Sequence, residues 1–92
     1  MTSLYELAPE AQNDVFEIWS HIALDSVDLA DRIEGEFHEL FASLGRMPRK
    51  GHRRRDLTKR PVLFCSLYSF VVAYQPDVRP IRIMALLRAS AT

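Results

Sequence analysis

The sequence predicts a single α+β domain in which an antiparallel pair of helices packs against an antiparallel sheet. The longest apolar run, Pro61 to Pro76, is rich in aromatic and β-branched residues, which are typical of strands. The segment before this run carries apolar residues at intervals of three and four, which is typical of amphipathic helices. We therefore expect a short N-terminal strand, an antiparallel helical hairpin and then a three-stranded antiparallel sheet.

Length and composition limit the class of protein. The 92 residues suffice for one small domain spanning residues 1–92, and 48% hydrophobic with 26% charged residues is typical of a folded chain. The single cysteine, Cys65, excludes an intrachain disulfide. The sequence has no apolar run long enough to cross a bilayer and no signal-peptide pattern, so we expect a cytoplasmic protein. It contains no metal-ligand motif, glycine-rich phosphate loop or Ser-His-Asp set, so we predict no metal, no other cofactor and no catalytic residue.

The first half of the chain predicts one strand followed by two helices. Residues 4–7 form the expected strand, which ends before Pro9 because proline suits the first turn of a helix. Asp25 or Ser26 predicts the start of the second helix, and Gly45 predicts a left-handed cap at its end. The apolar stripe of the first helix is Ala11, Val15, Ile18, Trp19, Ile22 and Ala23, and that of the second is Ala30, Ile33, Phe37, Leu40, Phe41 and Leu44.

The second half predicts three strands. Residues 63–67 and 70–75 form a hairpin with its turn at Tyr68-Ser69, and residues 81–87 form the third strand. Strand side chains alternate between faces, and here both faces are apolar, whereas two helices can cover only one. The uncovered face is a candidate partner surface, although a one-residue slip of the last strand would exchange its faces. The residues that we assign to this surface are Val71, Ala73, Met84 and Leu86.

Charge is distributed unevenly, although the net charge is zero. Residues 1–45 hold ten acidic residues and one basic residue, a net charge of −9, and residues 46–92 hold eleven basic and two acidic residues, a net charge of +9. Eight basic residues lie in residues 46–60, which we call the basic segment. Clustered arginine suits contacts with phosphate or carboxylate, but a solvated loop that balances the acidic helices is an equal alternative. We expect a basic target-facing surface along one edge of the sheet, formed by Arg54, Arg55, Arg60, Arg82 and Arg88.

The order of these elements resembles the RelE/ParE family of small bacterial toxins from type II toxin–antitoxin systems. The motifs that carry the resemblance are Tyr5-Glu6-Leu7 followed by PEAQNDVFEIWSHIA, the helix end LGRMPRKGHR, Arg60 ahead of LFCSLYSFVVAY, and the terminal strand IRIMALLRA. The resemblance covers nearly the whole chain, and each motif is a loose pattern that gains its specificity from the others.

The resemblance implies a cytosolic toxin that is neutralised by a cognate antitoxin. The antitoxin would cover the candidate partner surface, and the toxin would reach operator DNA only through it. The ParE-like branch inhibits DNA gyrase without known nuclease chemistry, whereas the RelE-like branch cleaves messenger RNA on the ribosome, often with a C-terminal tyrosine or histidine. Neither residue follows Arg88 here. We therefore expect a ParE-like, gyrase-directed toxin, with a ribosome-dependent endoribonuclease or an inactive antitoxin-binding module as the alternatives.

The chemistry of the residues also favours the gyrase-directed toxin over the endoribonuclease. Cleavage of RNA without a metal needs a base for the 2′-hydroxyl, an acid for the leaving oxygen and cations for the phosphorane. Arginine supplies only the cations because it stays protonated. His52, beside Gly51 in the basic segment, is the histidine closest in sequence to these cations, and a surface role is the commoner one for such a residue.

Overall fold

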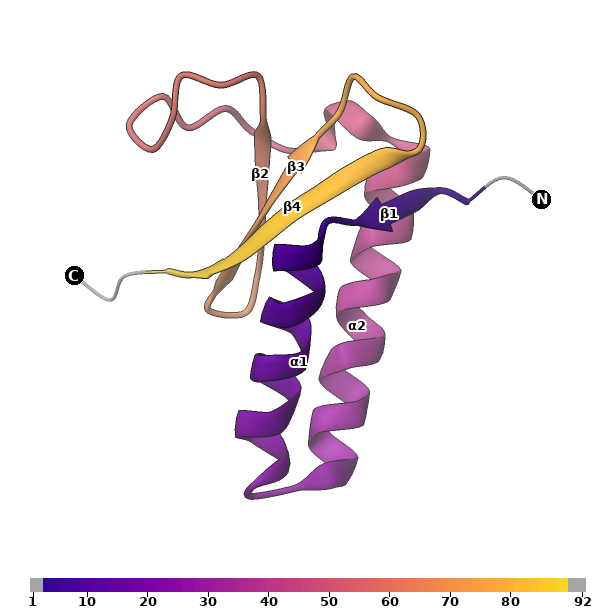
Figure 1. Cartoon of the computed structure of the whole chain (residues 1–92), viewed down its shortest axis with the longest axis vertical. Helices are drawn as coiled ribbons and strands as arrows, with labels where there is room; N and C mark the ends of the chain where they lie inside the picture. The colour runs from indigo at the N-terminus through magenta and orange to yellow at the C-terminus, as the bar shows by residue number, and fades with distance from the viewer. Residues whose placement is uncertain (1–2, 90–92) are drawn as a thin grey trace.

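Two helices and a four-stranded sheet form the computed structural model, which describes residues 3–89 (Figure 1). The elements are β1 (Tyr5–Leu7), α1 (Pro9–Ala23), α2 (Val27–Arg46), a short 3-10 helix η1 (Pro48–Lys50), β2 (Leu63–Leu67), β3 (Phe70–Gln75) and β4 (Ile81–Arg88). The strands lie in the order β1-β4-β3-β2. The predicted α+β class and helical hairpin are confirmed.

The first strand corrects the predicted sheet. β1 pairs in parallel with β4, with Tyr5 opposite Ile81 and Leu7 opposite Ile83, so the sheet has four strands instead of three. The periodicity of a short segment shows that it is a strand but does not show which distant strand it joins. β2 to β4 are antiparallel, as expected.

Capping and close packing set the ends of the second helix. The Ser26 hydroxyl oxygen accepts a hydrogen bond from the Leu29 N–H at 3.1 Å, which caps the start of α2. The expected left-handed cap at Gly45 is wrong, because Gly45 lies inside α2 and no glycine in residues 3–89 has a positive φ. A Cβ at Gly45 would lie 2.4 Å from the Leu4 carbonyl oxygen. Glycine is needed there because the chain leading into β1 crosses the helix closely.

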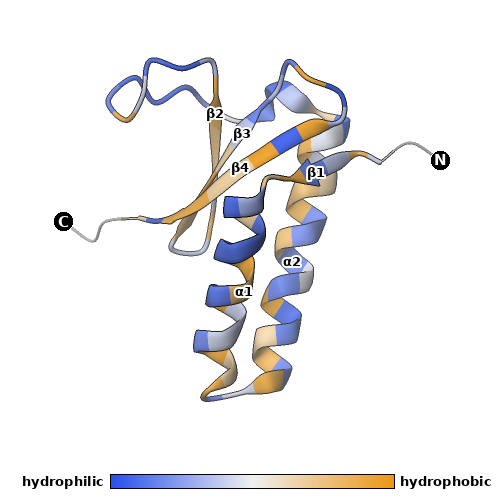
Figure 2. Cartoon of the chain, in the orientation of Figure 1, coloured by the Kyte–Doolittle hydropathy of each residue, from blue (hydrophilic) through white to orange (hydrophobic). Residues whose placement is uncertain are grey.

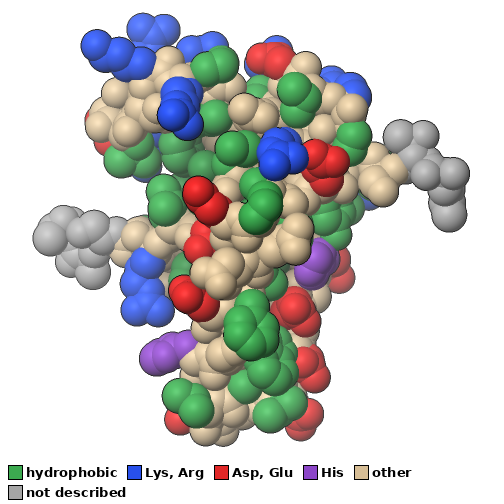
Figure 3. Space-filling view, in the orientation of Figure 1, with side chains coloured by type: hydrophobic (Ala, Val, Ile, Leu, Met, Phe, Trp, Pro, Cys, Tyr) green, Lys and Arg blue, Asp and Glu red, His purple; other side chains and the backbone are tan. Residues whose placement is uncertain are grey.

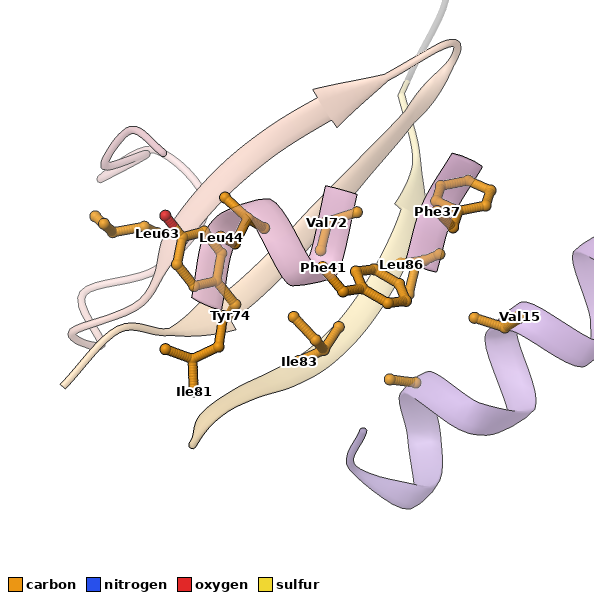
Figure 4. Close-up of a cluster of buried hydrophobic side chains, with 11 residues drawn as sticks. Val15, Phe37, Phe41, Leu44, Leu63, Val72, Tyr74, Ile81, Ile83 and Leu86 are labelled. Atoms are coloured by element: carbon orange, nitrogen blue, oxygen red, sulfur yellow. The ribbon is translucent and has the colours of Figure 1, made fainter. Parts of the chain in front are cut away.

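The main core lies between the helices and one face of the sheet (Figure 4). Both predicted helical stripes contribute to it, through Ala11 and Val15 of α1 and through three fully buried residues of α2. The sheet contributes Leu63, Val72, Tyr74, Ile81, Ile83 and Leu86, and α2 contributes Phe37, Phe41 and Leu44. Burial of these side chains supplies the main driving force for folding.

A bulge in β4 corrects the predicted alternation of that strand. Ala73 pairs with Ala85, whereas the next residue, Tyr74, pairs with Ile83, so Met84 is an extra residue in the ladder. The bulge shifts the alternation by one position, and Leu86 therefore lies on the helix-covered face, 6% exposed. Its expected place on the uncovered face is wrong, and Met84 is half-buried at the bulge.

The opposite face of the sheet is better buried than we expected. Val71 and Ala73 lie on it, as predicted, but they are only 9% and 7% exposed. They form a second cluster with Val62 and Phe64. Leu87, which pairs with Val71, is 45% exposed and extends the apolar surface toward the end of β4.

The hairpin turn at Tyr68-Ser69 lies where the sequence predicts it. Tyr68 has a φ of 56°, which is uncommon for a residue with a side chain. Its hydroxyl donates a hydrogen bond to the Glu36 carboxylate at 2.6 Å, and this bond raises the pKa of Tyr68. The turn is thereby tied to α2.

Candidate functional site

Tyr74 anchors the start of the basic segment to the sheet. Its ring is fully buried, and its hydroxyl donates a hydrogen bond to the Pro48 carbonyl oxygen at 2.7 Å. The Tyr74 hydroxyl oxygen in turn accepts a hydrogen bond from the Gly51 N–H at 2.8 Å. Burial raises the pKa of Tyr74, so the hydroxyl keeps its proton and both bonds at neutral pH.

The next residues hold the segment against the edge of β2. His52 and Phe64 exchange two backbone hydrogen bonds of 2.8 Å, an isolated antiparallel bridge. A Cβ at Gly51 would lie 2.6 Å from the Tyr74 hydroxyl oxygen and 2.9 Å from the Phe64 carbonyl oxygen. Glycine is required at position 51 because the chain passes so close to the sheet.

Replacing Tyr74 with phenylalanine should lower the free energy of unfolding by about 1–2 kcal/mol, because Pro48 and Gly51 lose a buried hydrogen-bond partner. Urea denaturation followed by circular dichroism measures this loss. Tyr68→Phe is the matched control, since it also removes a tyrosine hydroxyl, but one whose hydrogen bond to Glu36 is exposed to solvent. Water can replace that bond, so Tyr68→Phe should change the free energy of unfolding by less than about 0.5 kcal/mol. Equal losses in the two variants would contradict the anchoring role of Tyr74.

A turn in the basic segment brings its side chains around one cavity. The Arg54 carbonyl oxygen accepts hydrogen bonds from the N–H groups of Leu57 and Thr58, at 2.9 and 3.1 Å, so the chain reverses direction there. Both limbs of the turn line a cavity of about 370 Å³, which we call the basic cavity. Its lining residues are Arg53, Arg54, Arg55, Thr58, Lys59, Arg60 and Val62. Figure 2 shows that this part of the chain is mostly hydrophilic.

Most of the charge around the basic cavity is uncompensated. Arg54 donates two hydrogen bonds to the Asp56 carboxylate, at 3.0 and 2.8 Å, and these lower the pKa of Asp56. In residues 3–89, no side-chain hydrogen bond or ion pair engages the side chains of the other four basic residues of the lining. These are Arg53, Arg55, Lys59 and Arg60. The cavity is therefore a candidate site for an anion.

The remaining predicted arginines lie away from the basic cavity. Arg82 donates a hydrogen bond at 2.6 Å to Glu6, its neighbour on β1. The Arg88 guanidinium lies 5.7 Å from the centre of the Phe70 ring, which itself packs against the main core. Because of the bulge, Arg82 and Arg88 lie on opposite faces of β4. The expectation that all five arginines gather along one edge is therefore wrong, although Arg54, Arg55 and Arg60 do come together.

Sequence reasoning missed two parts of this site. Arg53, Thr58 and Lys59 line the basic cavity, but they were not predicted as site residues. Their position within the basic segment is the sequence feature that could have indicated them. The anchoring role of Tyr74 carries no local signal, because its partners precede it by more than 20 residues.

The described residues support neither a metal site nor a membrane-spanning helix. Within residues 3–89, no group of three or more His, Cys, Asp or Glu side chains could hold a metal ion. In the same part of the chain, neither helix has the length and apolarity required to cross a membrane.

Comparison with known protein families assigns the chain to one of them. Residues 5–91 match the model of the ParE toxin of the type II toxin–antitoxin system parDE. The chain belongs to the ParE toxin family. Its fold is similar to that of a chain in the solved structure of the chromosomal ParDE TA system from P. aeruginosa, with a TM-score of 0.76 and 19% sequence identity over 94% of this chain and 95% of that chain. Among curated proteins, none matches the sequence significantly.

The lining of the basic cavity of this ParE-family chain suits the binding of an anion. Its lining supplies guanidinium groups, one ammonium group and the Thr58 hydroxyl, but no carboxylate and no imidazole. Guanidinium groups stabilise negative charge and do not accept a proton at neutral pH. Of the histidines, His52 is exposed at the edge of β2, and His38 on α2 is hydrogen-bonded to the Tyr5 hydroxyl at 2.7 Å.

Proposed function

We propose that this ParE-family toxin inhibits DNA gyrase and is neutralised by a cognate antitoxin in the cytoplasm. Membership of the ParE toxin family is the main support for this proposal. The observation in the structure that favours it is the basic cavity, which offers cations to a target without the base that RNA cleavage requires. Arg54, Arg55 and Arg60 act as target-binding residues.

The antitoxin partner is proposed on two grounds. The solved structure with a similar fold is of a ParDE toxin–antitoxin system. In addition, the face of the sheet opposite the helices carries a second apolar cluster that neither α1 nor α2 covers. Antitoxin contact at Val71, Ala73 and Met84 remains our proposal, and the exposed Leu87 extends that surface. Leu86 is withdrawn from it because the helices cover Leu86. Contact with operator DNA is proposed to occur only through the antitoxin.

A supercoiling assay with purified gyrase, relaxed plasmid and ATP tests the proposal. The chain should inhibit supercoiling, and the product of the neighbouring antitoxin reading frame should restore it. Arg60→Ala should raise the concentration needed for half-inhibition about tenfold, because a charged contact with the target contributes about 1.4 kcal/mol or more. Arg46→Ala is the matched control, since Arg46 is an exposed arginine at the end of α2 outside the basic cavity.

Two results would overturn the proposal. One is normal gyrase activity together with site-specific cleavage of messenger RNA after induction of the chain in cells, which would identify a ribosome-dependent endoribonuclease. The other is an absence of both effects with tight antitoxin binding, which would identify a regulatory module.

A further inference from the structure

The basic cavity is held in place at both ends before any partner arrives. Tyr74 and the His52–Phe64 bridge fix the chain before the cavity, and residues 62–64 enter β2 directly after it. Between these points, the backbone bonds to the Arg54 carbonyl define the turn. A site whose geometry is fixed in advance binds a ligand with a smaller loss of conformational freedom.

The lining of the basic cavity favours a ligand that carries several negative charges. Four cationic side chains that have no acidic partner within residues 3–89 surround a space of about 370 Å³. Guanidinium groups bind the oxygens of phosphate in a bidentate manner, and the Thr58 hydroxyl is a further donor. The lining includes no aromatic or amide side chain, so it lacks the groups that most often stack on bases or read adenine.

The distribution of charge over the molecule favours a long, rigid polyanion as the ligand of the basic cavity. Figure 3 shows Lys and Arg side chains gathered around the loops at one end of the molecule, and Asp and Glu side chains along the helices. The basic segment lies at the end of the fold away from the tip of the helical hairpin (Figure 1). A DNA duplex can therefore reach the cavity while the acidic helices, which it repels, point away from it.

We propose that the basic cavity binds the phosphate backbone of double-stranded DNA without sequence preference. This inference rests on the proposed function. Gyrase acts on a DNA duplex and would bring that duplex close to a toxin bound beside it. Arg53, Arg55 and Arg60 contact phosphate oxygens, and Asp56 orients Arg54 at the rim of the cavity. This contact is separate from operator recognition by an antitoxin.

Fluorescence anisotropy of a labelled 20-base-pair duplex of mixed sequence, titrated with the full chain without gyrase, tests the proposal. Non-specific binding to the backbone predicts a dissociation constant of about 1–100 µM near physiological salt. The logarithm of the binding constant should fall with the logarithm of the salt concentration with a slope of about −3, which corresponds to about three phosphate contacts.

Matched double variants separate the cavity from general charge. Arg53→Gln with Arg55→Gln should weaken binding at least about tenfold and reduce the slope by about 2. Arg32→Gln with Arg46→Gln removes the same charge from exposed positions on α2, outside the cavity, and should change binding less than about twofold. Circular dichroism melts verify that both variants are folded.

Four results would overturn the DNA site. These are no binding of wild type at low salt, equal losses in the two double variants, at least tenfold tighter binding of single-stranded RNA of the same length, and preferential binding of poly-glutamate, which would indicate an acidic protein partner. The supercoiling assay separates this inference from the proposed function. Intact DNA binding without gyrase inhibition contradicts the proposed function alone, and gyrase inhibition without DNA binding contradicts the DNA site alone.

Discussion

Replacing Phe41 with alanine should lower the free energy of unfolding by about 3–5 kcal/mol, which is the usual range for a buried phenylalanine. Phe41 is 0% exposed and lies at the centre of the main core (Figure 4). Its ring centre lies 5.5 Å from that of Tyr5 on β1 and 6.3 Å from that of Phe37 on α2. Truncation leaves a cavity between the sheet and α2 and removes the edge-to-face contact that holds β1 there. Urea denaturation followed by circular dichroism measures the loss.

The matched control for this prediction is Phe16→Ala. Phe16 is also a helical phenylalanine, but it is 65% exposed, so its truncation should change the free energy of unfolding by about 0.5 kcal/mol or less. Since small domains are stable by only about 5–15 kcal/mol, Phe41→Ala should remove a large share of that stability. A loss below about 1 kcal/mol for Phe41→Ala would show that the helices do not pack on the sheet as described.

Replacing Gly45 with alanine should destabilise the protein by about 1–3 kcal/mol, although alanine is the better helix former. A Cβ at position 45 would lie 2.4 Å from the Leu4 carbonyl oxygen and 2.8 Å from the Leu4 Cβ. The first of these contacts is with backbone, so it cannot be relieved by rotation of a side chain. Leu4 would have to move, and its displacement would strain the parallel pairing of β1 with β4.

Gly35→Ala provides an internal comparison in the same helix. A Cβ at Gly35 meets no atom within 4 Å, so the substitution should stabilise the protein by about 0.5–1 kcal/mol through helix propensity alone. The two glycine-to-alanine variants should therefore differ by about 2–4 kcal/mol in the free energy of unfolding. Equal stability would contradict the close passage of the chain over α2.

Local patterns were enough to predict most of the elements. The predicted hairpin strands match β2 and β3 residue for residue, and Ser26 does begin α2 as a cap. These features depend on residues within a few positions of one another, through helical periodicity, strand alternation and capping. The sequence motifs also led to the correct toxin family, because the motifs extend over nearly the whole chain.

The candidate site could be predicted only in part. The basic segment was visible as a run of charge, and Arg54, Arg55 and Arg60 do line one cavity. The cavity itself depends on how the turn at Arg54 folds back and on the anchor from Tyr74, which is contributed by β3. Neither feature has a signature in the basic segment.

Contacts between residues far apart in the chain decided the rest of the structure. The sequence by itself determined the α+β class, the helical hairpin and the position of the basic segment. Only the tertiary structure showed that β1 joins β4, that Gly45 is needed for the close passage of Leu4, and that a bulge at Met84 moves Leu86 and Arg88 to the helix-covered face. The physical reason is that an extra residue in the strand ladder reverses the alternation of all side chains after it. The packing of the helices against the sheet decides whether the strand forms such a bulge.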